Sequence, residues 1–296
     1  MKNAFGLPKY HPKDIFTDDK VVESLRMMFK GWLSYMEIKN KEEVIEKTFE
    51  SFKRYSVETG LIEEDLREFY KNNKIIDGIK ECLQGRAEWI CDLIQDYVDG
   101  HVFDLGCGPG EIAQHLVDRK GCKMQLADVV DVPFRKTFAP NLPFYQSKQG
   151  KKLPFKDNQF DSGLLITVLH HSDDPFSLLD EIQRLAKGNI AIIESVYGLE
   201  RKHAPEGEAE KYPELYQGFH SLDKEQQRKY GTFLDWFLNK MILGNDINCP
   251  YNFTTPENWE RIFDERGFEI VHKQILGIDQ PVTPEYHALY IIRKKN

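Results

Sequence analysis

A glycine-rich turn between an apolar strand and a helix holds the residues best suited to binding a ligand. The segment 102–111 reads Val-Phe-Asp-Leu-Gly-Cys-Gly-Pro-Gly-Glu. Its three glycines allow tight backbone geometry and close approach of a ligand to main-chain amides. An apolar strand ending near Asp104, this turn and a helix beginning near Glu111 predict a binding site at one edge of a sheet.

The spacing of this turn excludes two common phosphate-binding motifs. A dinucleotide fingerprint requires G-x-G-x-x-G, whereas the sixth place counted from Gly106 is Glu111. An acid at the N-terminus of a helix would also repel a pyrophosphate. A Walker loop is excluded because no Gly-Lys-Ser/Thr follows the turn. The pattern therefore favours a nucleoside without phosphate that carries a positive or zwitterionic end.

The elements that must position this turn begin at residue 100. Short apolar or β-branched runs predict strands at 102–105, 123–127, 160–167 and 190–195. Helical patterns at 111–119 and 175–186 separate some of these strands, which predicts βαβ units around a parallel sheet. The runs 268–276 and 287–293 have no helix between them and predict an antiparallel pair that closes the sheet.

Two further segments flank or interrupt this pattern. Residues 1–99 are predicted to be helical, with apolar residues at three- and four-residue steps, and we expect a helical cap segment ahead of a main domain at 100–296. Within that domain, residues 198–253 interrupt the alternation of strands and helices and become rich in aromatic residues. We predict that this insertion is a lid over a site. The alternatives are core packing between helices for the first segment and an ordinary helical hairpin for the second.

Composition restricts the classes of partner and location. The chain has 296 residues, a net charge of −8 and no basic segment, so we expect a small-molecule partner and no nucleic acid. No apolar stretch approaches the length of a membrane span, and we see no secretory signal. The cysteines form no Cys-x-x-Cys pair, which argues against a disulfide framework or a metal site and favours the reducing cytoplasm. They are Cys82, Cys91, Cys107, Cys122 and Cys249.

Four sequence elements together resemble a known family. Asp104–Gly110 is similar to motif I of the class I S-adenosylmethionine-dependent methyltransferases. Asp128 follows Gly108 by 20 residues, where the family has an acid for the ribose hydroxyls. Leu153–Asp161 resembles the family's LPF-x-D-x-x-FD segment, and Leu169–Pro175 resembles its LHH-x-x-D-P turn. The nearest subgroup is the small-molecule type that resembles the ubiquinone/menaquinone methyltransferases.

The resemblance implies a fold, a cofactor and roles for individual residues. The implied fold is α/β, a doubly wound Rossmann-like sheet of seven strands with an antiparallel final pair, and the implied cofactor is S-adenosyl-L-methionine. The residues expected to bind it are Asp104, Gly106 and Gly108 at the methionine and ribose, Asp128 at both ribose hydroxyls, Val129 at the adenine and Thr167 beside the sulfonium. Relatives often have an Asp for the adenine amino group where this chain has Gln149, whose carbonyl accepts a hydrogen bond without charge assistance.

The chemistry of methyl transfer points to further candidates. The enzyme must align the acceptor with the methyl group, exclude water and, for some acceptors, remove a proton. His170 and His171 are candidate general bases because imidazole titrates near neutral pH, with a structural or positioning role as the alternative. Candidate acceptor contacts in the lid are His220, Phe233, Asp235 and Trp236.

These observations together predict an enzyme. We expect an S-adenosylmethionine-dependent methyltransferase that acts on a small, partly apolar or aromatic metabolite by direct displacement. Two alternatives stay open at this point. One is a protein or peptide methyltransferase, and the other is a catalytically silent scaffold subunit that binds the cofactor.

Overall fold

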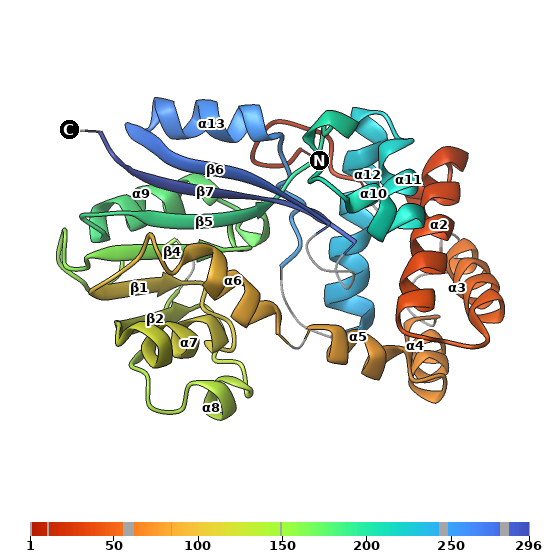
Figure 1. Ribbon diagram of the computed structural model, residues 1–296, viewed down its shortest axis with the longest axis horizontal. Coiled ribbons are helices and arrows are strands. Elements are labelled where there is room, and N and C mark those ends of the chain that lie inside the picture. Colours follow the sequence, from red (N-terminus) through yellow and green to blue (C-terminus); the bar gives the residue numbers. More distant parts are fainter. Residues whose placement is uncertain are drawn as a thin grey trace. The chain divides into compact units, whose positions relative to one another are not determined.

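The computed structural model describes residues 2–10, 12–55, 62–83, 85–148, 150–242, 248–278 and 284–295 (Figure 1). The chain divides into two compact units, each assembled from three separate stretches. The first unit comprises Met1–Gln84, Ser195–Pro256 and Ile275–His287. The second comprises Gly85–Glu194, Glu257–Gln274 and Ala288–Asn296.

A seven-stranded sheet in the order β3-β2-β1-β4-β5-β7-β6 organises the second unit. Strands β3, β2, β1, β4 and β5 are paired in parallel, whereas β7 is antiparallel to β5 and β6. This is the Rossmann-like arrangement expected from the sequence. The strands are β1 (His101–Leu105), β2 (Lys123–Asp128), β3 (Phe144–Gln146), β4 (Ser162–Ile166), β5 (Ile190–Ser195), β6 (Phe268–Ile278) and β7 (Tyr286–Lys294).

The helices of this unit connect and cover the parallel strands. Helix α9 begins after Asp174, whose side chain accepts a hydrogen bond from the Ser177 N–H at 3.1 Å, and Pro175 occupies its first turn. Its apolar stripe reaches β4 so closely that a Cβ at Gly163 would lie 2.8 Å from the Cδ1 of Ile182. The helices are α6 (Arg86–Ile94), α7 (Glu111–Lys120), α8 (Arg135–Phe138), the 3₁₀ turn η1 (Leu169–His171), α9 (Pro175–Leu185) and α13 (Pro256–Glu265).

The first unit is mainly helical. In Figure 1 the red helix α2 lies beside the cyan helices α11 and α12, which come from a distant part of the chain. Its elements are α1 (Pro12–Ile15), α2 (Asp19–Tyr35), α3 (Lys41–Tyr55), α4 (Ile62–Asn72), α5 (Ile75–Leu83), the 3₁₀ turn η2 (Arg201–His203), α10 (Glu208–Lys211), α11 (Pro213–His220), α12 (Lys224–Trp236) and the π-helical turn η3 (Phe237–Ile242).

An aromatic cluster forms the core of the first unit. Phe52 of α3 packs edge-on against Phe233 of α12, with ring centroids 5.1 Å apart, and Phe29 of α2 packs against Phe237 at 5.3 Å. Phe16, which precedes α2, stacks on Phe52 at 5.3 Å. Such contacts add to the stabilisation that burial of large rings already provides. Residues of the N-terminal helices and residues of the aromatic insertion therefore share one hydrophobic core.

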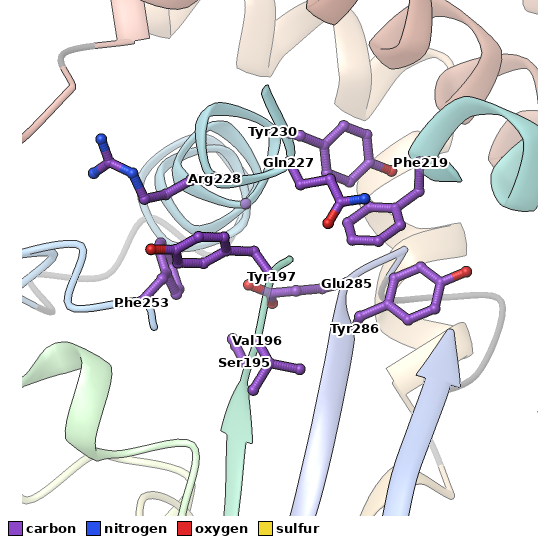
Figure 2. A pocket seen from close by; sticks show the side chains of 11 residues that line it. Ser195, Val196, Tyr197, Phe219, Gln227, Arg228, Tyr230, Phe253, Glu285 and Tyr286 are labelled. Carbon is purple, nitrogen blue, oxygen red and sulfur yellow. The ribbon is translucent and has the colours of Figure 1, made fainter. Parts of the chain in front are cut away.

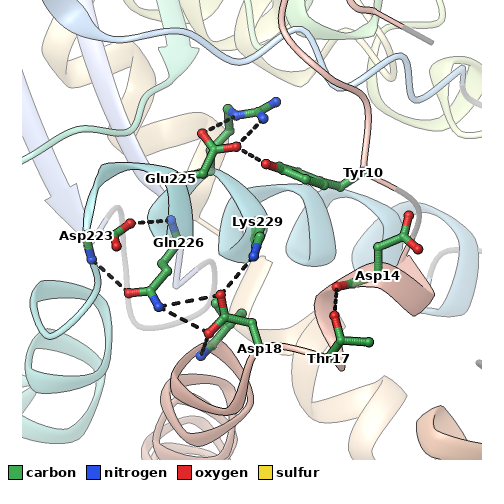
Figure 3. Close-up of polar contacts among 10 residues, drawn as sticks. Tyr10, Asp14, Thr17, Asp18, Asp223, Glu225, Gln226 and Lys229 are labelled. Atoms are coloured by element: carbon green, nitrogen blue, oxygen red, sulfur yellow. Dashed lines mark hydrogen bonds and ion pairs between the residues drawn. The ribbon is translucent and has the colours of Figure 1, made fainter.

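Polar contacts also fasten the N-terminal residues to α12 (Figure 3). The Asp18 carboxylate caps α2 and accepts hydrogen bonds from Lys229 Nζ at 2.8 Å and Gln226 Nε2 at 3.1 Å. Burial raises the pKa of Asp18, but the hydrogen bond and charge of Lys229 outweigh it and hold that pKa below its usual range. The Tyr10 hydroxyl donates to Glu225. Residues 1–84 and the aromatic insertion therefore belong to one folded unit.

Several elements differ from the sequence-based expectations. The short strand β3 was not expected, because its pattern is too short to stand out from its neighbours. The apolar positions Trp89, Ile90, Leu93, Ile94 and Tyr97 predict a helix that stops at Gly100, whereas α6 ends at Ile94. The apolar positions Val44, Ile45, Phe49, Phe52 and Tyr55 predict a helix that ends near Gly60, and that end lies outside the described residues. Whether residues 1–99 act as a cap and 198–253 as a lid stays a prediction.

None of the helices in the described part of the chain has the length and hydropathy required to cross a membrane.

Candidate functional site

The turn after β1 adopts a backbone that only glycine accepts easily. Gly106, Gly108 and Gly110 have φ angles of 81°, 49° and 79°. A Cβ at Gly106 would lie 2.5 Å from the Cγ2 of Val168, so this glycine is required by packing as well as by conformation. At Gly108, by contrast, no heavy atom of the described residues comes within 4 Å of such a Cβ. The backbone at Gly108 therefore leaves space in which a ligand could lie.

The Asp128 side chain lies directly against this turn. The parallel pairing of β1 with β2 aligns Leu105 with Ala127, which brings the carboxyl ends of both strands to one edge of the sheet. One Asp128 oxygen accepts the Gly108 N–H at 2.9 Å, and the other accepts the Val130 N–H at 3.2 Å. An ionised carboxylate offers about four acceptor positions, so capacity remains for two hydroxyls of a ribose.

Asp104, the other acid at this edge, is almost completely buried at 3% exposure. Burial, together with the nearby charge of Asp128, raises the pKa of Asp104 to about 7. Two acids that repel each other in this way favour a ligand that brings positive charge. The pair therefore suits a ligand group with positive charge, and the backbone beside Gly108 is open to a ligand.

The raised pKa of Asp104 predicts a pH dependence of stability. The folded protein holds this proton up to about pH 7, whereas the unfolded chain releases it near its ordinary value of 3.8. The free energy of unfolding should therefore fall as the pH rises from about 4 to about 7. Asp104→Asn should remove this decrease in the free energy of unfolding between about pH 4 and pH 7. Denaturation without cofactor at a series of pH values measures it.

The control for this experiment is Asp118→Asn, which removes an exposed carboxyl on α7 of the same unit. At each pH, the difference in free energy of unfolding between a variant and the original protein gives the contribution of the one acid that was replaced. Parallel stability curves for Asp104→Asn and the original protein would contradict the assignment of a shifted pKa to Asp104.

Two further predicted cofactor contacts, Val129 and Thr167, fall at or near this edge. Val129 directly follows β2 and is 51% exposed. Thr167 directly follows β4, where its N–H donates to the Ile193 carbonyl at 2.7 Å. Its φ of 54° is unusual for a β-branched residue and marks local backbone strain of the kind found at functional sites. Gln149 lies outside the described residues.

The predicted histidine pair lies in the 3₁₀ turn after β4. His170 is buried at 4% exposure, and its Nδ1 lies 2.6 Å from Oε2 of Glu194. His171 is half-buried, and the two imidazole rings have centroids 4.1 Å apart. Sequence reasoning missed Glu194, although one signal was present. It is the acid in the apolar run 190–195, and a charged residue inside a buried strand is rarely left without partners.

The predicted lid residues lie in the first unit. Phe233 is fully buried in the aromatic cluster, Trp236 is 6% exposed, and Asp235 is 3% exposed and accepts a hydrogen bond from Asn239 Nδ2 at 2.9 Å. Burial, followed by the positive charge of Arg201, lowers the pKa of His220 to about 4. This histidine is therefore uncharged at neutral pH.

His220 belongs to a buried hydrogen-bonded chain that the sequence did not reveal. Its Nε2 lies 3.0 Å from the Tyr286 hydroxyl, which also hydrogen-bonds Glu208. Glu208 accepts the Ile278 N–H at 2.8 Å, and burial raises the pKa of its carboxyl despite these bonds. The Tyr286 ring stacks on Phe219 with centroids 4.1 Å apart.

A cavity in the first unit adjoins this chain (Figure 2). It is lined by aromatic rings and polar groups, and its volume is only about 10 Å³, which is room for about one water molecule. Its lining residues are Ser195, Val196, Tyr197, Phe219, Gln227, Arg228, Tyr230, Gly231, Phe253, Glu285 and Tyr286.

Comparisons with known proteins agree with the chemistry of the glycine turn. Residues 103–193 match the family model described as "Methyltransferase domain". A curated relative, the mitochondrial arginine-hydroxylase NDUFAF5 of Mus musculus, is 27% identical over 124 residues, or 41% of this chain. The matched region spans only about a third, 36%, of that relative's length.

Solved structures resemble the chain at low sequence identity. The 1,6-didemethyltoxoflavin-N1-methyltransferase of Burkholderia thailandensis, solved with 1,6-didemethyltoxoflavin and S-adenosylhomocysteine, has a TM-score of 0.47 and 14% identity, covering 79% of this chain and 88% of that one. A Haloferax volcanii complex of the Trm112 methyltransferase activator with a methyltransferase has a TM-score of 0.49 and 12% identity, covering 78% and 98%.

The family model covers the segment that contains the glycine turn, both site acids and the histidine pair. The subtype similar to the ubiquinone/menaquinone enzymes has no support from these matches. The sheet order, the turn after β1 and the matched segment lead to one assignment. Within this chain, residues 103–193 match a methyltransferase domain, and they contribute strands to a sheet of Rossmann-like order.

Proposed function

We propose that this protein transfers a methyl group from S-adenosylmethionine to a small, partly apolar or aromatic metabolite. The observation that carries the proposal is the arrangement at the edge of the sheet, where the Asp128 carboxylate holds the Gly108 N–H at 2.9 Å beside open space. The acids at this edge suit a cationic nucleoside, and the glycines let the protein main chain come close to it.

The residues of the second unit would bind and orient the cofactor. Asp128 would accept the two ribose hydroxyls, Asp104 would lie at the methionine end, and Val129 would pack on the adenine. Thr167 would lie beside the sulfonium. When bound, the cofactor supplies an electrophilic methyl group on sulfur. The protein has to hold an acceptor atom in line with that group and keep water away.

His170 is the proposed base for an acceptor whose proton must leave, and His171 assists its placement. The two rings lie close together at an interplanar angle of 44°, and this contact and the fixed backbone of the turn favour a defined orientation. A general base within hydrogen-bond reach of the acceptor would take the proton as the new bond to carbon forms.

The acceptor contacts proposed in the aromatic insertion are His220, Asp235 and Trp236. We propose the reducing cytoplasm as the location, because the cysteine spacing in the sequence is not that of a disulfide framework.

A second candidate function is binding of the cofactor without methyl transfer. The name of the mouse relative, an arginine-hydroxylase, favours this candidate because it assigns a reaction other than methylation to a related domain. A protein or peptide methyltransferase is a further alternative. Transfer of labelled methyl groups to a metabolite pool, to an arginine-containing peptide library or to neither separates the three functions.

The proposed cofactor should stabilise the protein against unfolding. S-adenosylhomocysteine at about 100 times its dissociation constant should raise the free energy of unfolding by about 2.7 kcal/mol. Asp128→Ala should abolish most of this increase, because the bonds to the ribose are lost, while the protein without ligand remains folded. Thermal and chemical unfolding with and without the ligand provide the measurement.

Two controls accompany this experiment. Asp118→Ala removes an acid on the exposed face of α7 and should respond to the ligand like the original protein. NAD should produce no comparable increase, because the turn lacks the dinucleotide pattern. Stabilisation by NAD together with none by S-adenosylhomocysteine would overturn the proposed function.

A further inference from the structure

Glu194 has an unusual environment at the end of the apolar strand β5. It is fully buried, with 0% exposure. One carboxylate oxygen accepts the N–H groups of Val168 at 2.8 Å and Leu169 at 2.7 Å. The other oxygen accepts the His170 N–H at 3.3 Å and contacts its Nδ1 at 2.6 Å. One side chain thus holds three consecutive backbone groups and the imidazole of the turn after β4.

This set of contacts determines which nitrogen of His170 carries the proton. An ionised carboxylate has acceptors only, so the Nδ1 atom at 2.6 Å must be the donor. In a neutral imidazole with its proton on Nδ1, the lone pair resides on Nε2. The hydrogen bonds from the three backbone N–H groups to Glu194 also keep the turn from rotating away from the carboxylate. Buried polar groups satisfied in this way gain a fixed geometry.

A purely structural role for Glu194 would not need the contact with the ring. Three backbone N–H groups would already satisfy the carboxylate, and an amide or hydroxyl could cap so short a turn at a lower desolvation cost. The short contact to Nδ1 adds a charged partner that also stabilises an imidazolium when the ring gains a proton. This is the arrangement in which a carboxylate orients a histidine that acts as a base.

We propose that Glu194 is a positioning residue that fixes His170 in the Nδ1–H form, so that Nε2 is the ring nitrogen able to take a proton from the methyl acceptor. This inference rests on the proposed function. In the step it serves, the acceptor heteroatom forms a bond to the methyl carbon and the carbon–sulfur electron pair stays on sulfur. The acceptor proton goes to Nε2 of His170, and the resulting imidazolium is paired with Glu194 until the proton passes to solvent.

The tautomer of His170 can be measured without knowing the acceptor. Nitrogen-15 NMR of the histidine-labelled protein distinguishes Nδ1–H from Nε2–H rings, and His170→Gln identifies the signals of this residue among the nine histidines. The original protein, at a pH where the ring is neutral, should show His170 in the Nδ1–H form. A ring in the Nε2–H form would overturn the inference.

Substitution of the carboxylate supplies the second measurement. Glu194→Gln keeps the size of the side chain but replaces one acceptor oxygen by an NH₂ donor, so the Nε2–H population of His170 should increase at least several-fold. Glu194→Asp keeps a carboxylate and should retain the Nδ1–H form, which provides a readout should the Gln variant fail to fold. An unchanged tautomer in a folded Glu194→Gln protein would contradict the proposal.

A matched control and a separate binding measurement complete the design. Glu181 on α9 also accepts a backbone N–H, that of Leu153 at 2.8 Å, and also pairs with a basic side chain, so Glu181→Gln should leave the His170 signals unchanged. The affinity for S-adenosylhomocysteine should stay within a few-fold in Glu194→Gln. Failure of the original protein to bind that ligand would defeat the proposed function, whereas an incorrect tautomer with intact binding would defeat only the role of Glu194.

Discussion

Phe233→Ala should lower the free energy of unfolding by about 3–5 kcal/mol. Phe233 is fully buried, and its ring lies 5.1 to 5.8 Å from the ring centroids of four neighbours. Because these neighbours come from several separate elements, they cannot all move to fill the space left by the ring. The cost therefore includes a cavity as well as lost burial of apolar surface. Equilibrium denaturation in urea measures the change.

The control for this prediction is Tyr35→Ala, which removes an aromatic ring that is 53% exposed on α2 of the same unit. We expect this variant to lie within about 0.5 kcal/mol of the original protein. The prediction competes with the interpretation of Phe233 as an acceptor contact of a lid. A Phe233→Ala protein with the original stability and reduced turnover would support the acceptor contact and contradict the expected loss of stability.

His170→Ala should reduce the rate of methyl transfer by about 10²- to 10⁴-fold, because a general base contributes a factor of this size. The remaining rate should lose the pH dependence that a titrating base produces. Cofactor affinity should change little, since the role of His170 concerns the acceptor. The measurement is transfer of an isotopically labelled methyl group from S-adenosylmethionine to the metabolite pool as a function of pH.

Two further histidine variants test the specificity of this effect. His171→Ala should cause a smaller loss, with an unchanged pH profile, if this residue only assists placement. His272→Ala provides a control, because this histidine stacks on Tyr97, with ring centroids 5.1 Å apart, at a different position in the second unit. Normal turnover in both His170→Ala and His171→Ala would show that the account of the acceptor chemistry is wrong, even with the cofactor assignment intact.

The sequence alone predicted the elements around the glycine turn because their signals are local. The three glycines at 106, 108 and 110 identify a turn that requires left-handed backbone angles, and the structure has these angles. The apolar run 190–195 matches β5 residue for residue, and the helical pattern at 111–119 matches α7 to within one residue. Four elements in family order were sufficient to indicate the cofactor class. Each of these signals depends on residues close together in the chain.

The contacts of the site with distant residues could not be predicted in this way. An acid in an apolar strand signals that Glu194 needs partners, but it does not identify His170, 24 residues earlier. Likewise, the Tyr286 hydroxyl bonds Glu208, which is 78 residues away. The pairing depends on the order of strands in the sheet and the path of the connections, which no local pattern contains.

The composition of the first unit was decided by tertiary structure as well. The sequence indicated apolar stripes in the N-terminal helices and many aromatic residues in the insertion, and it left their partners open. An apolar stripe indicates that one face of a helix is buried. It does not indicate which surface covers that face, because hydrophobic attraction has no direction. In the folded protein Phe16 packs on Phe233 and Asp18 pairs with Lys229, 211 residues later. These two stretches share a core because each alone exposes an apolar face that the other covers.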